Sequence, residues 1–297
     1  MLDTIIRFFL DMIAWLISLI TAGSITLYEP PAPPEIPDVP DVMTQEITVM
    51  SFNIYSKRDG DYAFDGRING VVETILNEKP DSVGLQEAHD AWRFNLWKNL
   101  DDEYGWACWA GRDFGFGEAV PILYRKDKYI LLEESVFWLS ETPRFPSVGW
   151  DAALRRVAGY AVLQDRETGF TYVHFNSHFD HVGEIARANS ARLVADRINE
   201  MNLPAVFTAD VNARPNTLPT NYLEAGGLIN LRGTAAVSDT GSTFHAYSGG
   251  IGNSIIDHIY ANHYLREAAY FKVIRDKYDG LYPSDHFAIS AKLTLAN

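Results

Sequence analysis

The pattern of hydrophobic positions divides the chain into three parts. Residues 2–27 form the most apolar segment, a proline-rich stretch follows, and short apolar runs then alternate with helical patterns up to the end. Proline fixes its own φ angle and has no backbone N–H, so the proline-rich stretch favours an extended conformation that acts as a spacer. We therefore predict an N-terminal hydrophobic helix over residues 1–28, a linker over 29–45 and a folded domain over 46–297.

The N-terminal segment is predicted to be helical because Asp3, Arg7 and Asp11 recur on one side at helical spacing. A helix of about twenty apolar residues can span a bilayer, and Arg7 as its flanking basic residue would place the domain outside the cytoplasm. A cleaved export signal, a helix lying in the membrane surface and a helix docked on its own domain stay open as alternatives. We expect a protein that is membrane-anchored with its domain outside the cytoplasm, or secreted.

Within the domain, three apolar runs typical of buried strands end on an acid or an amide, at Asn53, Glu87 and Asp210. Helical periodicity between the first two runs predicts a β-α-β unit, which lays its two strands near one another. Asn212 follows Asp210 by two positions, and side chains at this spacing in an extended segment point the same way. Asp210 and Asn212 are therefore expected to face one small anionic group, the first as a proton acceptor and the second as a hydrogen-bond donor.

Further polar groups lie at the ends of later strands. Arg156 begins one strand, where it could bind a phosphate with two hydrogen bonds or form a surface ion pair. His178 lies at the end of another. Asp257 interrupts an apolar strand, and a buried carboxylate needs a partner. We pair it with His286, which opens the final strand beside Asp285, because an aspartate fixes the tautomer of an imidazole and stabilises its charged form.

The donor set favours magnesium or manganese over zinc. Asn53, Glu87 and Asp285 offer hard oxygen ligands, which Mg²⁺ and Mn²⁺ prefer. The histidines within residues 174–181 do not have the spacing of the usual zinc motifs, so we interpret His178 as a group that contacts phosphate and binds no metal. These side chains suit attack of water on phosphorus, in which a cation neutralises oxygen charge and a base activates the nucleophile.

Charge and composition exclude some classes of protein. The formal net charge is -14, which disfavours a protein that grips long duplex nucleic acid through many phosphates. A phosphate substrate stays compatible with this charge if a cation intervenes. The single cysteine, Cys108, excludes an intramolecular disulfide and a thiolate zinc site. Residues 111–117 are glycine-rich but lack the spacing of a nucleotide-binding loop, so we predict a flexible loop there.

Six short motifs, in this order, resemble those of the endonuclease/exonuclease/phosphatase superfamily, the deoxyribonuclease-I-like proteins. They are Asn53, Leu85-Gln-Glu87, Asn176-Ser-His178, Asp210-Val-Asn212, Ile256-Asp257-His258 and Ser284-Asp285-His286. Residues 149–156 and 178–187 resemble more narrowly a bacterial branch whose substrates are poorly defined. The resemblance implies an α/β fold of four layers, with two mixed β-sheets packed face to face and helices outside. One departure is Thr208-Ala209 in place of the usual glycine before the aspartate.

The resemblance also implies a role for each catalytic residue. Glu87 would be the principal metal ligand, helped by Asn53 and Asp285. Asp210 would orient or deprotonate the water, and His286 with Asp257 would complete the acid–base and charge-stabilising groups. Which of Asp210 and His286 is the general base stays open. The residues expected to bind the substrate phosphate are Arg156, Asn176, His178 and Asn212.

We therefore predict a Mg²⁺- or Mn²⁺-dependent hydrolase of phosphate esters, either a phosphodiesterase or a phosphomonoesterase. Its substrate would be a lipid headgroup, a small molecule or nucleic acid. One alternative is a nuclease acting on single-stranded or short nucleic acid. An alternative from another class is a catalytically inactive binding module on a membrane stalk. No protein partner is predicted.

Overall fold

The computed structural model describes residues 42–249 and 254–297. The predicted N-terminal helix over 1–28 and nearly all of the linker lie outside these residues. The prediction of a membrane anchor, which depends on that helix, therefore stays a prediction. Within the described ranges, no helix is both long and apolar enough to cross a bilayer. All described residues belong to one compact unit, Pro37–Asn297. Its first strand begins at Thr44, slightly before the predicted start of the domain.

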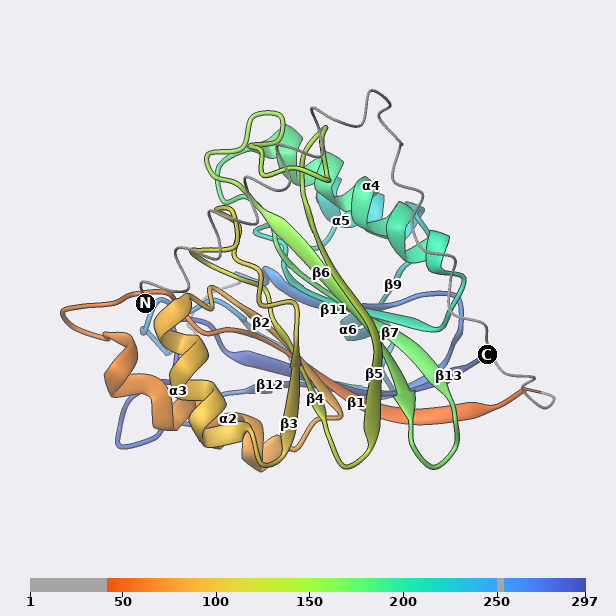
Figure 1. The fold of residues 1–297 in the computed structure, drawn as a ribbon, viewed down its shortest axis with the longest axis horizontal. Helices are drawn as coiled ribbons and strands as arrows, with labels where there is room; N and C mark the ends of the chain where they lie inside the picture. Colours follow the sequence, from red (N-terminus) through yellow and green to blue (C-terminus); the bar gives the residue numbers. More distant parts are fainter. Residues whose placement is uncertain (1–41, 250–253) are drawn as a thin grey trace, which may run out of the picture. The chain divides into compact units, whose positions relative to one another are not determined.

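The fold contains two mixed β-sheets (Figure 1). One of them has seven strands. Its strands, in sheet order, are β10 (Val237–Ser238), β12 (Leu265–Ile274), β13 (Ala288–Ala296), β1 (Thr44–Asn53), β2 (Ser82–Gln86), β4 (Ile122–Arg125) and β3 (Tyr104–Ala107). The central strands β1 and β2 run parallel, and β13 is antiparallel to β1. Burial on both faces explains why β1 and β2 are near-continuous apolar runs in the sequence.

The second sheet has six strands. In sheet order they are β5 (Tyr129–Trp138), β6 (Val157–Asp165), β7 (Thr171–His178), β8 (Ala205–Asp210), β11 (Asp257–Ala261) and β9 (Ile229–Asn230). The central strands β7 and β8 are again a parallel pair, and β11 runs antiparallel to β8.

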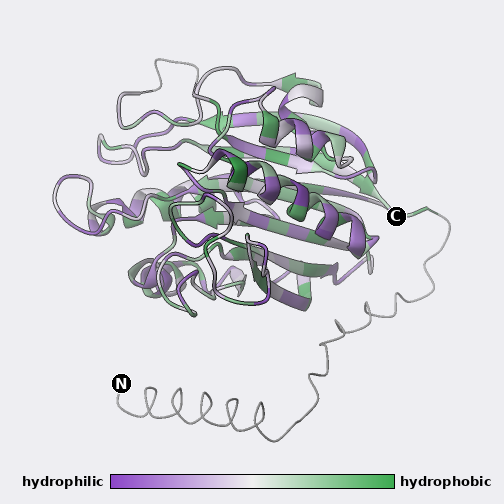
Figure 2. Cartoon of the chain, turned by 90° about the horizontal axis from the view of Figure 1, so that it is seen from above, coloured by the Kyte–Doolittle hydropathy of each residue, from purple (hydrophilic) through white to green (hydrophobic). Residues whose placement is uncertain are grey.

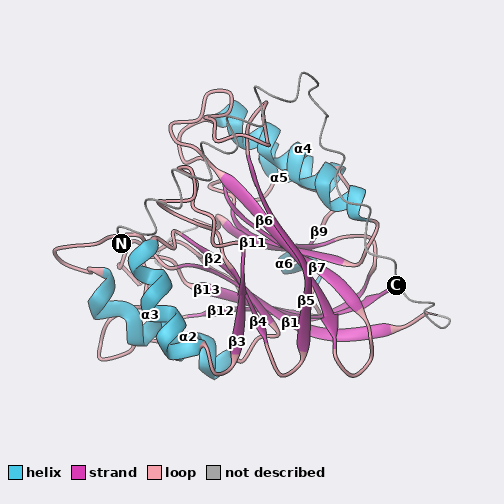
Figure 3. Cartoon of the chain, in the orientation of Figure 1, coloured by secondary structure: helices cyan, strands magenta, loops and turns pink. Residues whose placement is uncertain are grey.

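Helices cover the outer faces of both sheets (Figure 3). The helical elements are η1 (Phe64–Arg67), α2 (Ile68–Glu78), α3 (Asp90–Leu100), α4 (Glu184–Met201), α5 (Leu218–Ala225) and α6 (Leu231–Thr234). Buried side chains of α2 and α3 pack with those of β1 and β2, and α4 and α5 pack on β7 and β8. The helices in Figure 2 carry hydrophilic and hydrophobic positions side by side, as expected when one face of each is buried.

A third apolar cluster lies between the sheets and includes Val49 of β1, Tyr172 of β7 and Ile259 of β11. The molecule therefore has the four layers helix, sheet, sheet and helix, which confirms the predicted fold class. Both sheets place a parallel pair of strands at their centre, and the carboxyl ends of such a pair meet at one edge of the sheet. The polar side chains that follow the central strands are therefore expected at these edges of the two sheets.

Candidate active site

The strand ends carry the polar side chains that the sequence singled out. Asn53 is the last residue of β1, and Glu87 directly follows its parallel neighbour β2. In the other sheet His178 ends β7 and Asp210 ends β8, and the two residues are partners in the strand register. Asp257 begins β11, where it pairs with Asp210 across the antiparallel strands. Parallel pairing therefore brings these side chains to the ends of neighbouring strands within each sheet.

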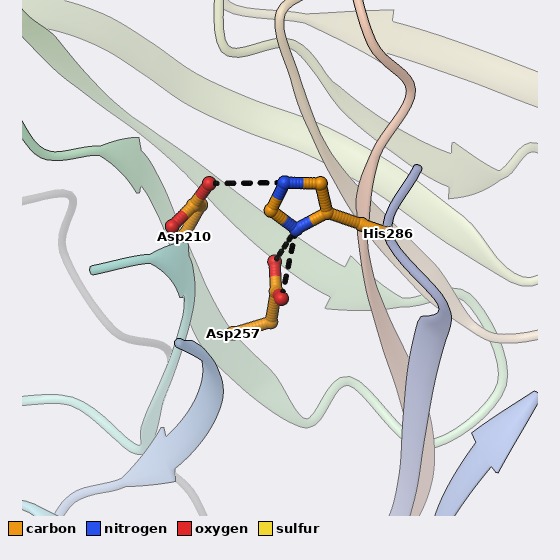
Figure 4. A group of neighbouring side chains, drawn as sticks. All are labelled: Asp210, Asp257 and His286. Carbon is orange, nitrogen blue, oxygen red and sulfur yellow. Dashed lines mark hydrogen bonds and ion pairs between the residues drawn. The ribbon is translucent and has the colours of Figure 1, made fainter. Parts of the chain in front are cut away.

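Asp210 links residues from both sheets and is buried, with 1% of its surface exposed. Its Oδ2 atom accepts a hydrogen bond from Nδ2 of Asn53 at 3.0 Å. The same oxygen lies 3.5 Å from Nε2 of His178 and 3.8 Å from Nε2 of His286, as Figure 4 shows for the second contact. Four residues that lie far apart in the sequence thus meet at one carboxylate.

His286 lies between two aspartates (Figure 4). Its Nδ1 atom is 2.9 Å from Oδ2 and 3.1 Å from Oδ1 of Asp257, and its Nε2 faces Asp210. Burial alone would lower the pKa of His286, but the charge and hydrogen bond of Asp257, followed by the charge of Asp210, raise it to about 10. The imidazole is therefore held in its charged form at neutral pH.

The electrostatic environment suits Asp210 as a proton acceptor. Burial and the negative charge of Asp257 raise the pKa of Asp210, while His286 and the hydrogen bonds of Asn212 and Asn53 oppose the shift. A carboxylate whose pKa is raised toward neutrality is a stronger base than an ordinary aspartate. A charged imidazolium has no free lone pair, so in this arrangement Asp210 fits the role of general base better than His286.

Glu87 is oriented by its own backbone and by two donors. It adopts a left-handed backbone conformation with φ of 61°, which is uncommon for a non-glycine residue and is a form of local strain that clusters at functional sites. Nδ2 of Asn53 donates to its Oε1 at 3.0 Å, and the backbone N–H of Ser56 donates to its Oε2 at 2.7 Å. Burial alone would raise the pKa of Glu87, but these donors hold it below its usual value.

Asp285 lies close enough to Glu87 to respond to its charge. Burial, together with the charge of Glu87, raises the pKa of Asp285 against the opposing charge of His286. Two half-buried carboxylates that repel one another form a donor set of hard oxygens, which fits Mg²⁺ or Mn²⁺. The residues present at this position therefore fit a divalent cation.

Asn53 is turned differently from what its predicted role as a metal ligand requires. Its Oδ1 atom accepts the backbone N–H of Tyr55 at 3.0 Å, and its Nδ2 faces the carboxylates of Glu87 and Asp210. As an oxygen ligand it would have to turn its amide around. In this structure Asn53 orients the two carboxylates.

A second group with metal-ligating atoms consists of Asp210, Asp257 and His286, whose ligand atoms lie within 4.8 Å of one another. Both ring nitrogens of His286 face a carboxylate oxygen. The charged imidazole carries a proton on each nitrogen and so offers no lone pair to a metal. This group fits proton transfer and charge stabilisation better than cation binding.

His178 and Asn212 lie together, as predicted for a pair that contacts phosphate. Nδ2 of Asn212 is 3.0 Å from Nε2 of His178 and also donates to the carbonyl of Phe179 at 3.1 Å. The backbone N–H of Asn212 donates to Oδ1 of Asp210 at 2.9 Å. Burial and the nearby positive charge of Arg156 lower the pKa of His178 well below its ordinary value, so this ring is neutral.

Arg156 is buried at the start of β6, beside a small cavity. Its Nε donates to Asp180 at 3.4 Å, and its Nη2 lies 3.1 Å from Nδ1 of His181. The cavity has a volume of about 10 Å³, room for about one water. Its lining residues are Glu87, Arg112, Glu118, Ala119, Val120, Arg156, Val157 and His178.

Arg112 and Glu118 were missed by the sequence reasoning. They form an ion pair at the base of the glycine-rich segment that was predicted to be a flexible loop, and the backbone N–H of Arg112 donates to the carbonyl of Glu118. The available signal was a pair of opposite charges flanking a glycine-rich turn. Nothing in that pattern says which strand ends it approaches.

The prediction that Asn176 binds the substrate phosphate is wrong in this structure. Its side chain is fully buried between the sheets, and its Nδ2 donates to the carbonyls of Leu85, Val120 and Pro121. Its Oδ1 accepts from Nε2 of Gln86 at 2.7 Å. No amide hydrogen is left for a phosphate oxygen, because Asn176 lies two positions before the strand end and faces the sheet interface.

The segments that carry Asn53 and Asp285 are tied together by Arg67, which is 2% exposed. Its guanidinium donates to the carbonyls of Ile54, Tyr55, Tyr62 and Pro283 at 2.6–2.9 Å. Oγ of Ser284 donates to the carbonyl of Asn53 at 2.6 Å. These bonds fix the end of β1 against the segment that leads into β13.

Solved structures similar to this chain share its fold over most of their length. A Bacteroides thetaiotaomicron protein of the endonuclease/exonuclease/phosphatase family is 29% identical, with a TM-score of 0.81, over 85% of this chain and 99% of the other. A mannosyl-6-phosphatase from the same species is 30% identical, with a TM-score of 0.77, over 83% and 99%. TDP2 from D. rerio, in complex with a single-strand DNA product, is 18% identical, with a TM-score of 0.66, over 84% and 98%.

No sequence among the curated proteins matches this chain. The family model described as Endonuclease/Exonuclease/phosphatase family matches residues 50–286, a range that begins in β1 and ends at His286. By this match and by the likeness of the solved structures, the chain belongs to the endonuclease/exonuclease/phosphatase family.

Proposed function

We propose that this protein is a divalent-metal-dependent phosphatase that releases phosphate from the monoester of a sugar. The observation that carries the proposal is the environment of Asp210, a buried carboxylate between a charged His286–Asp257 pair and the His178–Asn212 pair. Such a group supplies a base, a positive charge and hydrogen-bonding groups at one point. Hydrolysis of a phosphate ester needs all three.

In the proposed reaction, the water oxygen bonds to phosphorus while the bond between phosphorus and the sugar oxygen breaks. Asp210 accepts a proton of the attacking water, the departing sugar oxygen takes up a proton to leave as an alcohol, and Asp210 then releases the proton it accepted. His286, kept charged by Asp257, stabilises negative charge that develops on phosphate oxygens as the water attacks. His178 and Asn212 hydrogen-bond the phosphate, which requires that it take the place of one of their present contacts.

Glu87 and Asp285 would hold the divalent cation, with Asn53 beside them. A divalent cation held there would neutralise charge on the phosphate and orient it. The residues' own contribution is to present two carboxylates, of which that of Glu87 is fixed in place by the backbone N–H of Ser56 and by Nδ2 of Asn53.

Two arginines favour a terminal phosphate over a bridging one. Arg156 and Arg112 both line the small cavity next to Glu87 and His178. A monoester phosphate has three free oxygens and carries more charge than a diester, so it is better matched to two guanidinium groups. The cavity is small, and binding would require Arg112 to exchange its ion pair with Glu118 for the phosphate.

The likeness to a mannosyl-6-phosphatase, at 30% identity, supports a phosphorylated sugar as the substrate class. The likeness to TDP2, at 18% sequence identity, supports the fold alone. A net charge of -14 also disfavours a nuclease, because nucleic acid carries a charge on every phosphate. A catalytically inactive binding module has no use for the strongly shifted pKa values of His286 and His178.

The test is phosphate release from mannose 6-phosphate, compared with hydrolysis of p-nitrophenyl phosphate and bis-p-nitrophenyl phosphate, with Mg²⁺, with Mn²⁺ and after EDTA. We expect metal-dependent turnover of both monoesters, slower turnover of the diester, and loss of activity by about a thousandfold in Glu87→Ala and Asp210→Asn.

The matched control is Asp127→Asn, because the Asp127 side chain is 65% exposed and pairs only with Arg125 among the described ion pairs. It should keep full activity. Wild-type rates in Glu87→Ala or Asp210→Asn would refute the site, and a diester rate above the monoester rates would refute the phosphatase assignment.

A further inference from the structure

A second pocket lies beside α3 and is lined by none of the residues assigned to phosphate chemistry. It has a volume of about 600 Å³, within the range of sites for small molecules. Its lining residues are Asp90, Arg93, Phe94, Trp97, Trp106, Ala107, Cys108, Trp109 and Glu134. They come from α3, from β3 at the edge of one sheet and the residues after it, and from β5 at the edge of the other.

Aromatic rings dominate the lining of this pocket. Phe94 and Trp97 are 64% and 51% exposed, and exposed apolar side chains that adjoin one another mark binding sites more often than single ones do. Together with Asp90 and Arg93 they recur at the spacing of one helix face. The buried face of α3 is formed by other residues, including Trp92, so the core does not require these rings.

Two further rings of the lining belong to Trp106 and Trp109, whose ring centroids lie 5.5 Å apart. The guanidinium of Arg93 lies 5.6 Å from the ring centre of Trp109. Oε2 of Glu134 accepts the backbone N–H of Cys108 at 2.6 Å, which fixes this carboxylate within the lining. The pocket thus combines aromatic faces with carboxylates and a guanidinium at defined positions.

This combination matches the two sides of a sugar ring. The C–H groups of a pyranose are attracted to the negative face of an aromatic ring, and its hydroxyl groups donate to carboxylates and accept from a guanidinium. The two carboxylates, Asp90 and Glu134, disfavour an anionic polymer. A purely apolar ligand would leave the charged groups of the pocket desolvated, which is costly.

Two short stretches of chain connect the pocket with the small cavity beside Arg156. Asp90 follows Glu87 by three residues, and Arg112 follows Trp109 by three, and such a stretch spans at most about 11 Å. A β-bridge pairs Ala88 of the first stretch with Ala119, which lines the small cavity. A ligand that fills both sites therefore needs a length of about one or two sugar rings.

We infer that the α3 pocket binds a pyranose ring of an oligosaccharide whose phosphorylated end is hydrolysed at Asp210. This assignment rests on the proposed phosphatase function for the identity of the whole substrate. Binding of the sugar is a property of the pocket itself and is measurable without turnover. The inference makes Trp97 and Phe94 determinants of substrate specificity, distinct from the residues that act on phosphate.

The first test measures binding of unphosphorylated mannobiose by calorimetry to the full chain and to its Trp97→Ala, Phe94→Ala and Glu87→Ala variants. We expect binding to the wild type, a loss of about fivefold or more in affinity in Trp97→Ala and Phe94→Ala, and wild-type affinity in Glu87→Ala. Because both aromatic side chains are largely exposed, their truncation should leave folding intact.

The control is Val237→Ala, which removes an exposed apolar side chain of β10 at the opposite edge of the same sheet from β3. It should bind mannobiose as the wild type does. No measurable mannobiose binding, or equal affinity in Trp97→Ala, would overturn the inference. Binding of a short single-stranded oligonucleotide in place of mannobiose, lost in Trp97→Ala, would also overturn it in favour of a nucleobase.

Kinetics separate this inference from the proposed function. For mannobiose phosphorylated at its terminal 6-hydroxyl, Trp97→Ala should raise KM about fivefold and leave kcat unchanged, while both parameters for p-nitrophenyl phosphate stay as in the wild type. Absence of all phosphatase activity with mannobiose binding intact would refute the reaction and leave the pocket assignment standing. Phosphatase activity with an unchanged KM in Trp97→Ala would refute the pocket assignment and leave the proposed reaction standing.

Discussion

Nδ1 of His286 lies 2.9 Å from Oδ2 of Asp257, and both side chains are buried. The aspartate is the main cause of the raised pKa of His286, which burial alone would lower. The charged form that we propose for the reaction is therefore maintained by one neighbouring carboxylate. This relationship gives the first prediction.

Asp257→Asn should lower the pKa of His286. Activity requires the charged imidazole and is lost as the pH rises through that pKa, so the alkaline limb of the rate profile should move to lower pH, by about one to three units. At neutral pH, kcat should fall about a hundredfold. The measurement is kcat/KM for p-nitrophenyl phosphate from pH 5 to 10, with Asp127→Asn as control. An unchanged alkaline limb in Asp257→Asn would contradict the role of the pair.

Arg67→Lys should destabilise the fold and also weaken Mg²⁺ binding. Lysine keeps the charge but cannot donate to four carbonyls from one planar group, so we expect the free energy of unfolding to fall by about 2–4 kcal/mol. The Mg²⁺ concentration for half-maximal activity should rise about tenfold, because the segments holding Asn53 and Asp285 lose their common donor. Urea denaturation and a Mg²⁺ titration measure the two effects.

The control for this change is Arg266→Lys, since Arg266 is exposed on β12. It should alter neither quantity. Loss of stability in Arg67→Lys without any change in the Mg²⁺ requirement would show that Arg67 supports the fold alone.

Gly84→Ala should be strongly destabilising. A Cβ atom at this position would lie 2.0 Å from Oγ1 of Thr208 and 2.5 Å from Oδ1 of Asn176 in the other sheet. The sheets would have to separate locally, at a cost of about 3 kcal/mol or more. Chemical denaturation measures the loss. Gly66→Ala is the matched control, because a Cβ there meets nothing within 4 Å, and equal stability losses in both variants would contradict the steric explanation.

His174 should make stability fall as the medium becomes acidic. Burial between Ser82 and Thr208 lowers its pKa to about 3, from about 6.5 in the unfolded chain. The contribution is fully present above the unfolded value. Between pH 6.5 and about 3 the unfolded chain binds the extra proton, so the free energy of unfolding falls by up to about 1.4 kcal/mol per pH unit.

The measurement is urea denaturation of the wild type and His174→Gln at pH 7 and pH 5. Over this interval the wild type should lose about 2 kcal/mol more than the variant. His263→Gln, at an exposed residue, should keep the wild-type dependence. Parallel losses in the wild type and His174→Gln would rule out this source of acid sensitivity.

Functional residues at strand ends could be predicted from the sequence because a buried strand is apolar, whereas the residue that acts on a substrate is polar. A doubly covered strand is a continuous apolar run, so the acid or amide that ends it stands out, as with Asn53, Glu87 and Asp210. Asp257 and His286 could be paired because a buried carboxylate needs a partner. The structure brings these residues together as expected.

Other features could not be read from the sequence, for physical reasons. β12 was not predicted, because its exposed face carries Arg266, Glu267 and Lys272 and its apolar pattern depends on pairing with β13. Asn176 was assigned to the phosphate together with its motif. Its distance from the strand end and the face that it presents depend on the strand register, which no local pattern gives. Arg112 and Glu118 were missed since a turn gives no direction for the side chains that flank it.

The ends of β1 and β2 belong to one sheet, and those of β7 and β8 to the other. Neither sheet holds a complete catalytic set, since Glu87 and Asp210 are on opposite sides of the seam between them. Catalytic activity should consequently appear only in the last stage of folding, when the two sheets pack against each other. A phosphate bound between the cation ligands of one sheet and the His178–Asn212 pair of the other would join the two sheets, so it should stabilise the whole domain and not one local segment.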